Sequence, residues 1–509
     1  MKDRDVEKGG NGPMEHRLQP SDAPIVSALA AYRRRRRASF HVPGHKAGAA
    51  YASDREADAW LGAVGRYDAT ELPGLDDLHA PAGAIEDAQK LAAECFGALR
   101  TYFLVGGSTV GNLAAIHAAA GPGELLVMQR DAHKSAMHAL MLRGAGAVFA
   151  FPAADATTGL YGGLAAEAVA DALDKYPEAK AVFVTSPNYY GISADIERIA
   201  RETHDRGKAL IVDEAHGAHF GHHPRFPASA LRQGADVVIQ STHKMLPALT
   251  MGAMLHLGSD RIPRERIEAF LRMLQSSSPS YPILASLDWA RRELHTRGAA
   301  LFEGALQALD ALPAQLRAVA DGRFGVVSSA DPMKPLLFDG CGEWTGYELS
   351  DRLTEYGIYT EMATDRYTVL ACSAATTIED MLRLSTALEE IASRYSAKKK
   401  EIQQNSSNMY ALGALSLSSP VYLKAEDAIA ASGPDEPRVI PWEEAAGETC
   451  AEMVIPYPPG IPIALPGEPL TTETVEAVVR LREQGAAVQG VVDRSLRTVR
   501  VWDRNPSYS

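Results

Sequence analysis

The chain has 509 residues, of which 46% are hydrophobic and 23% charged, as in an ordinary folded globular protein. At ~150 residues per domain, this length allows about three domains. The formal net charge of −13 argues against nucleic acid as the main partner. No run of 18 apolar residues occurs, and residues 1–11 hold no apolar segment, so we expect neither a transmembrane helix nor a secretory signal.

Four widely spaced cysteines form no Cys-x-x-Cys pair: Cys95, Cys341, Cys372 and Cys450. This usage is typical of reduced, mostly buried thiols and favours a cytoplasmic protein.

Residues 1–38 are expected to form a flexible segment with a short helical pattern at 25–32. The five arginines at 33–37 could contact nucleic acid, a membrane or an acidic neighbouring subunit, but a solvated helix end is the simpler interpretation. The loop at 39–48 contains His41, His45, a proline and two glycines. Its spacing does not match zinc ligands and no cysteine lies nearby, so we expect a substrate or interface loop and no metal site.

Short apolar runs then alternate with helical patterns. The expected strands are 101–105, 125–128, 147–151, 181–185, 209–212, 237–239 and 251–257, and the expected helices are 84–96, 107–120, 163–174 and 195–206. Apolar runs of this length, bounded by turn signals, are typical of buried parallel strands. The alternation predicts a doubly wound, mostly parallel α/β sheet, which binds ligands at the carboxyl ends of its strands.

Two strand ends carry polar groups that suit a ligand. After residue 105 come Gly107, Ser108 and Thr109 at the start of a helix, where backbone N–H groups and hydroxyls favour an anion. A capped helix without a ligand is the alternative. His133 follows the strand at 125–128 and could lie flat on an aromatic cofactor, or be an interior histidine with a satisfied hydrogen bond.

Two further strand ends carry Asp213 and Lys244. A lysine with an acid one strand away suits pyridoxal 5'-phosphate, because the amine forms the Schiff base and the carboxylate keeps the pyridine nitrogen protonated. A solvated lysine is the alternative. A nucleotide-hydrolase acid at 213–216 would need a Gly-x-x-x-x-Gly-Lys-Ser/Thr loop, and none occurs.

The rest of the chain divides into further units. A long helix at 283–297 leads out of a large domain at 39–285 into a small α/β domain at 286–397, with expected strands at 325–328, 334–338, 358–361 and 368–371. A charged, then Gln/Asn/Ser-rich linker at 398–419 precedes a C-terminal α+β domain at 420–509. Five prolines between 456 and 466 suggest a rigid wall, with Glu452 and Tyr457 as candidate substrate contacts.

Eight ordered motifs between residues 38 and 468 resemble the bacterial ornithine/lysine/arginine decarboxylases, in particular their shorter members without the N-terminal wing domain. The motifs are 40–46 (FHVPGHK), 74–79 (GLDDLH), 106–109 (GGST), 133–135 (HKS), 213–217 (DEAHG), 241–244 (STHK), 276–279 (SSSP) and 456–462 (PYPPGIP). The resemblance implies an aspartate-aminotransferase-like (fold type I) architecture. It also implies pyridoxal 5'-phosphate as cofactor, and α-decarboxylation of a basic amino acid, with arginine favoured over lysine or ornithine.

The resemblance also assigns site residues. Lys244 is the Schiff-base lysine, Asp213 the partner of the pyridinium nitrogen and His133 the stacked histidine. The phosphate and lysine-flanking positions are Gly107, Ser108, Thr109, Ser241 and His243, and His243 is the candidate acid that protonates Cα. His216 stands where some relatives carry tryptophan, and contacts the ring or the substrate.

The family also implies a homodimer or a larger dimer-based assembly, in which Ser277 and Ser278 reach a neighbour's phosphate. A different fold type I reaction, such as an aminotransferase with Arg366 on the substrate carboxylate or a lyase, remains the main alternative. A non-catalytic regulator and a nucleic-acid binder through residues 33–37 are the others.

Overall fold

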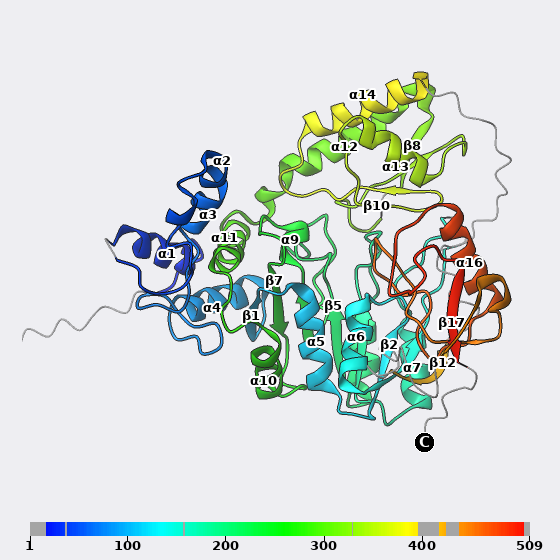
Figure 1. Cartoon of the computed structure of the whole chain (residues 1–509), viewed down its shortest axis with the longest axis horizontal. Coiled ribbons are helices and arrows are strands. Elements are labelled where there is room, and N and C mark those ends of the chain that lie inside the picture. The colour runs from blue at the N-terminus through cyan, green and yellow to red at the C-terminus, as the bar shows by residue number, and fades with distance from the viewer. Residues whose placement is uncertain are drawn as a thin grey trace, which may run out of the picture.

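A computed structural model describes residues 17–35, 38–155, 158–327, 329–394, 417–423 and 437–502. Its centre is an eight-stranded sheet (Figure 1). The strands lie in the order β1 (Arg100–Leu104), β7 (Ala253–Leu257), β6 (Val237–Gln240), β5 (Ala209–Asp213), β4 (Ala181–Thr185), β2 (Leu125–Gln129), β3 (Gly146–Ala150) and β12 (Leu417–Tyr422). Strands β2 to β6 are parallel, whereas β7 and β12 run antiparallel to their neighbours.

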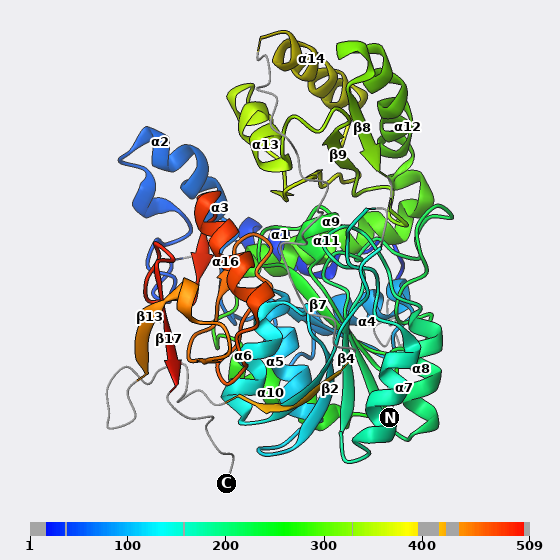
Figure 2. The ribbon, with the colours of Figure 1, turned by 90° about the vertical axis from the view of Figure 1, so that its right-hand side faces the viewer.

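Helices cover both faces of this sheet (Figure 2). Helices α5 (Gly107–Ala119), α6 (Lys134–Arg143) and α10 (Arg264–Leu274) pack on one face, and α7 (Ala166–Lys175) and α8 (Ile196–Asp205) on the other. Successive strand residues point to opposite faces, so Met128 joins the core under α5 and α6 while Val127 joins the core under α7 and α8. The seven strands expected from the sequence are all present, and the expected helix at 84–96 is α4 (Ala84–Phe96).

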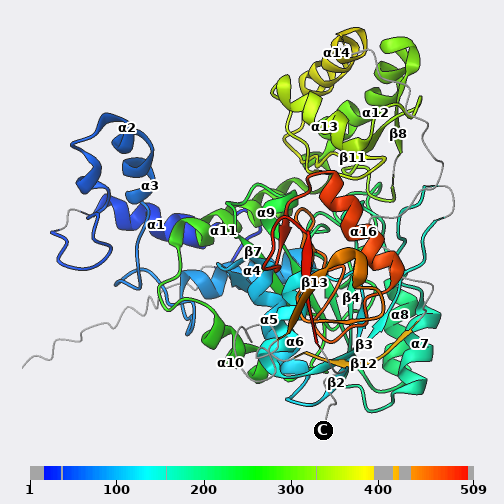
Figure 3. The ribbon, with the colours of Figure 1, turned by 45° about the vertical axis from the view of Figure 1, so that its right-hand side comes forward.

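The N-terminal helices form a lobe on the side of the sheet where α4 and α11 lie (Figure 3). Within the expected flexible segment, α1 (Pro24–Arg34) packs on α4 and α11 (Tyr281–Arg297), and the Ile25 N–H donates to Asp288 over 2.9 Å. The short helices α2 (Arg55–Ala57) and α3 (Ala63–Gly65) project from this lobe. Residues 1–16, Arg36 and Arg37 lie outside the described residues.

A smaller antiparallel sheet follows, in the order β10 (Met362–Ala363), β11 (Thr368–Val369), β9 (Leu336–Asp339) and β8 (Phe324–Val327). It packs with α12 (Glu303–Ala318), α13 (Gly346–Glu355) and α14 (Ile378–Arg394). The expected strand at 358–361 is wrong, because the Ile358 N–H instead donates to the Leu353 carbonyl and closes the end of α13.

The C-terminal unit is built from β13 (Arg438–Pro441), β17 (Thr498–Trp502), β14 (Thr449–Cys450), the pair β15 (Ile455–Pro456) and β16 (Val488–Gln489), and α16 (Thr472–Glu483). Of the expected linker, residues 398–416 lie outside the described residues, and residues 417–419 begin β12 in the large sheet. Arg130, just past β2, forms a bidentate ion pair with Glu468, in which Nε lies 3.0 Å from Oε1 and Nη2 lies 2.7 Å from Oε2. This pair connects the C-terminal unit to the carboxyl ends of the strands.

Across the described ranges, no helix is long and apolar enough to cross a membrane.

Candidate active site

The carboxyl ends of β5 and β6 bring the two central residues together. Asp213 is the last residue of β5. Strand β6, its parallel neighbour, continues through Ser241 into the short helix α9 (Thr242–Met245), which carries Lys244. Parallel strands end at the same edge of a sheet, so the lysine and the acid face the same space.

Lys244 is a partly buried amine. Its Nζ lies 3.0 Å from Nε2 of His216 and 5.3 Å from the centroid of the Tyr189 ring. Burial lowers the pKa of Lys244 to about 8, although the charge of Asp213 acts in the opposite direction. A lowered pKa increases the fraction of free amine near neutral pH, and the free amine is the nucleophilic form.

Asp213 is almost fully buried, at 2% exposure. Its Oδ2 accepts a 2.8 Å hydrogen bond from Nδ2 of Asn112, and its Oδ1 accepts one of 3.1 Å from the Ala215 N–H. Burial raises the pKa of Asp213, and the Asn112 hydrogen bond and the Lys244 charge lower it. In the described residues no cation makes an ion pair with this carboxylate, so it could hold a protonated ring nitrogen.

His133 is joined to Asp213 by a chain of hydrogen bonds. Asn112 also donates to the hydroxyl of Ser135 over 3.0 Å, and that hydroxyl lies 2.8 Å from Nδ1 of His133. The Ser135 N–H donates to the same Nδ1, so the ring proton belongs on Nε2. Burial lowers the pKa of His133 to about 3, and the imidazole is therefore neutral.

The N-terminus of α5 forms a third side of the site. No side chain caps it, and apart from its chain neighbours and its own helix no described atom lies within 4 Å of a Cβ built at Gly107, whose φ is +74°. Ser108 accepts a 2.7 Å hydrogen bond from Ser241, and Thr109 is exposed. An open helix N-terminus with hydroxyls beside it suits a phosphate.

His216 lies between two lysines. Its Nε2 is 3.0 Å from Lys244, and its Nδ1 is 3.0 Å from Nζ of Lys334, which precedes β9 in the small domain. The Tyr189 ring packs against the imidazole, with centroids 4.4 Å apart. The sequence did not single out Lys334, which follows the turn at Asp331-Pro332.

A second residue that the sequence did not reveal is Glu361, just before β10. It is exposed, and its charge opposes the larger effect of burial, which lowers the pKa values of Lys244, Lys334 and His243. The small domain therefore places a carboxylate at the mouth of the site.

Other predicted residues stand further from the lysine amine. Nδ1 of His243 lies 3.0 Å from the Gly252 carbonyl, so this ring is held against the start of β7. Ser277 and Ser278 are exposed in the loop between α10 and α11, and the structure joins neither to Ser108 or Thr109.

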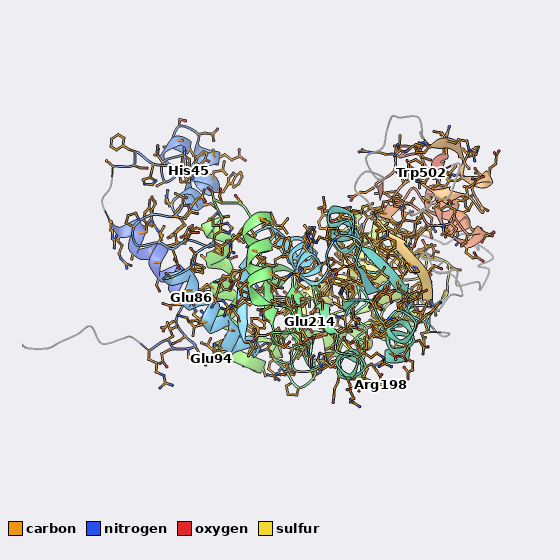
Figure 4. All side chains as sticks on the ribbon, turned by 90° about the horizontal axis from the view of Figure 1, so that it is seen from below. His45, Glu86, Glu94, Arg198, Glu214 and Trp502 are labelled. Carbon is orange, nitrogen blue, oxygen red and sulfur yellow. The ribbon has the colours of Figure 1, made fainter. Side chains whose placement is uncertain are left out.

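The four predicted substrate contacts are split between the two ends of the molecule. His41 and His45 belong to the N-terminal lobe, where His45 bonds Asp68 over 3.1 Å, and Figure 4 shows His45 at the opposite end from Trp502 of the C-terminal unit. Glu452 is buried, and its Oε1 accepts from Arg500 and from the Val492 N–H, while its Oε2 has no partner in the described residues. Tyr457 lies near Lys134, whose Nζ is 4.6 Å from the ring centroid.

These residues fit pyridoxal 5'-phosphate. Lys244 could bond the aldehyde, Asp213 the ring nitrogen, His133 one ring face and the α5 N-terminus the phosphate. The buried Oδ1 of Asn112 has no hydrogen-bond partner in the described residues, so an acceptor atom stays unpaired beside Asp213.

Comparison with known proteins agrees with this geometry. Residues 23–371 match the family described as Orn/Lys/Arg decarboxylase, major domain, and residues 410–487 match its C-terminal domain. The chain is 38% identical over 478 residues to the uncharacterized protein YaaO of Bacillus subtilis (strain 168), covering 92% of this chain and 96% of that protein. It is 34% identical over 496 residues to the arginine decarboxylase of the same organism, covering 95% and 98%.

A solved structure shows the same fold. The lysine decarboxylase LdcF of Francisella novicida superposes with a TM-score of 0.74 at 19% identity, covering 94% of this chain and 81% of that one. The predicted fold type I architecture, with its mixed, mostly parallel large sheet and its C-terminal domain, is therefore confirmed.

Proposed function

The chain belongs to the Orn/Lys/Arg decarboxylase family of pyridoxal 5'-phosphate enzymes, and from this premise we propose that it converts arginine to agmatine and CO2. The observation that carries the proposal is that Lys244 and Asp213 lie at the ends of neighbouring parallel strands. The lysine would be the attachment point of the family's cofactor, and the acid would be the partner of its ring nitrogen. Arginine is favoured because relatives at 34% and 35% identity over nearly the whole chain are named arginine decarboxylases. Lysine and ornithine are the next candidates.

When bound, pyridoxal 5'-phosphate supplies an aldehyde that condenses with amines and a pyridinium ring that accepts the electron pair left when CO2 departs. Asp213 would accept the hydrogen bond of the ring nitrogen and so keep that nitrogen protonated. His133 is neutral and hydrogen-bonded through Nδ1, and it would cover one face of the ring. Lys244 would be the attachment point of the cofactor.

The substrate needs two further contacts. Its side chain ends in a cation, and Glu361 is an exposed carboxylate whose charge already acts on Lys244. We assign Glu361 as the partner of the guanidinium, which a carboxylate can bind through two parallel hydrogen bonds. For the proton delivered to Cα, His243 stays our candidate.

A second subunit would complete the site. Ser277 and Ser278 lie on the exposed loop between α10 and α11, and His41 and His45 lie in the N-terminal lobe. In a homodimer these loops would contact the neighbour's phosphate and substrate, as the family resemblance suggests.

A product assay tests the function. The purified protein with pyridoxal 5'-phosphate is given arginine, lysine and ornithine separately, and agmatine, cadaverine, putrescine and CO2 are quantified. We expect agmatine to dominate.

Three variants test the site residues in the same assay. Lys244→Ala should reduce turnover at least about a thousandfold, and Asp213→Asn should keep the cofactor bound but lose most of the activity. Lys208→Ala is the control and should have no effect, because this lysine bonds the Pro177 carbonyl outside the site.

The same assay distinguishes the alternative. An aminotransferase would yield a keto acid from the amino acid and no CO2. Arg366, the candidate carboxylate clamp for that reaction, is exposed and stacks on Tyr367 at 5.3 Å. Keto acid without diamine or agmatine would move the function to that class, and wild-type turnover in Lys244→Ala would overturn the site itself.

A further inference from the structure

The hydrogen bonds around His216 are restricted by the chemistry of its ring. A neutral imidazole has one N–H donor and one acceptor nitrogen, while an ammonium group can only donate. His216 has a lysine nitrogen 3.0 Å from each ring nitrogen. If both lysines were ammonium ions, one of them would face the ring N–H, and that contact would be repulsive.

His216 is neutral. The imidazole is 3% exposed, and burial together with the charges of Lys244 and Lys334 moves its pKa well below the usual value. Both contacts are therefore satisfied only when one lysine is an ammonium ion and the other a free amine. The ring thus makes the two lysines share a single positive charge.

The surroundings favour Lys334 as the charged member. Lys334 is 1% exposed, and in the described part of the chain its side chain bonds only His216 and forms no ion pair. Burial lowers the pKa of Lys334, and the charges of Glu361 and Asp331 oppose that effect. The other ionisable groups that act on this cluster are Asp213, His133, His243, Tyr189 and Cys372. Of these, Asp213 acts to raise the pKa of Lys244, but burial still lowers that pKa to about 8.

We propose that Lys334, acting through His216, is a positioning residue that lowers the proton affinity of the Lys244 side-chain nitrogen and so favours its neutral amine. The Lys334 ammonium donates to Nδ1, so the ring proton lies on Nε2 and points at the Lys244 lone pair. A proton can pass through the ring, because Nε2 gives its proton to Lys244 while Nδ1 takes one from Lys334. The positive charge then moves from Lys334 to Lys244, and the total number of protons on the three side chains stays the same. This inference rests on the proposed role of Lys244 but needs no turnover to test.

The test measures the protonation of Lys244 directly in the full-length protein freed of cofactor. An amine-acylating reagent is pulsed from pH 6 to pH 11, and modification of Lys244 is quantified by mass spectrometry against Lys208. We expect a midpoint near pH 8 in the wild type. In Lys334→Met the midpoint should rise by about one pH unit, because a nearby positive charge disfavours a second one. Lys334→Gln is the second neutral variant, should the first fail to fold.

Two further variants separate charge from shape. Lys334→Arg keeps a donor and a charge, so its midpoint should stay at or below that of the wild type. His216→Phe keeps a ring against Tyr189 but removes both nitrogens, so adding Lys334→Met in that background should shift the midpoint much less. Equal midpoints in the wild type and the neutral variants, or an undiminished shift without the imidazole, would overturn the proposal. Absence of agmatine in the product assay would overturn the substrate assignment and leave this result intact.

Discussion

Asn112 on α5 donates a 2.8 Å hydrogen bond to Asp213 at the end of β5, and it also donates to Ser135 at the start of α6. One amide therefore connects the helix expected to hold the phosphate with the acid expected to hold the ring nitrogen, and with the serine that orients His133. Asn112, Asp213, Ser135 and His133 therefore form one continuous hydrogen-bonded unit.

This connection predicts the effect of Asn112→Leu. The variant removes a donor to a buried carboxylate, which raises the pKa of Asp213 further and weakens its hold on a protonated ring. A hydrogen bond to a charged group contributes ~1.5–3 kcal/mol, so kcat/KM should fall about tenfold to a hundredfold. Steady-state decarboxylation and a cofactor titration by absorbance measure the loss.

Gln89→Leu provides the matched control. This buried amide accepts from the Phe103 N–H beside α4, outside the site, so the variant should lose stability and keep its kcat/KM. If both variants lost activity in proportion to their stability, the assigned role of Asn112 would be wrong.

Glu361→Gln tests how the substrate cation is recognised. The change keeps the size of the side chain and removes its charge, so KM for arginine should rise about tenfold or more, with a smaller change in kcat. The preference for arginine over citrulline, whose side chain is neutral, should shrink by the same factor. Glu355→Gln, at the end of α13 in the same domain, should leave both quantities unchanged. An unchanged arginine preference in Glu361→Gln would exclude Glu361 as the partner.

The large sheet and the residues at its strand ends were predictable from the sequence. Short apolar runs bounded by turns define β1 to β7, and the rule that parallel strands end at one edge brings Asp213 and Lys244 together without any knowledge of packing. His133 and the α5 turn follow from the same rule. Such predictions depend only on residues close in the sequence to each strand end.

Lys334 and Glu361 were not predictable in this way. They reach the site from the small domain, more than 80 residues after Lys244 in the chain, and their roles depend on how that domain packs over the large sheet. Glu452 depends on packing in the same way, because the sequence places it beside the proline wall as a candidate substrate contact, and the fold pairs its Oε1 with Arg500. Spacing in the sequence gives no information on such long-range pairing.

Gly460→Ala tests the contact between the C-terminal unit and the site. Gly460 has φ +91°, and a Cβ there would lie 3.0 Å from Nε2 of His133. The ring would have to move, so we expect cofactor affinity to fall about tenfold or more in addition to a loss of stability. Absorbance titration with pyridoxal 5'-phosphate and thermal unfolding separate the two effects.

Gly447→Ala is the matched control, because Gly447 belongs to the same unit, has φ +89° and has no atom within 4 Å of the added Cβ. Both variants put alanine in a left-handed conformation and should lose ~1 kcal/mol of stability for that reason. Only Gly460→Ala should lose cofactor affinity. An equal affinity in the two variants would show that the His133 ring tolerates the displacement.

Glu214, next to Asp213, predicts how stability depends on pH. It is buried, accepts from Gln240 at 2.7 Å and from the Ala230 N–H at 2.8 Å, and burial raises its pKa to about 8. A glutamate in an unfolded chain has a pKa of ~4.3, so between about pH 4.5 and pH 8 the native state binds a proton that the unfolded state has lost. Its contribution to stability is therefore fully present below the pKa of the unfolded chain and is lost as the pH rises through the pKa of the native state.

Glu214→Gln removes this titration. Between pH 5 and pH 8.5 the Tm of the variant should therefore fall by a few degrees less than the Tm of the wild type does. The exposed Glu265→Gln should follow the wild-type profile, and parallel profiles for Glu214→Gln and the wild type would show that Glu214 is ionised in the native protein throughout this range.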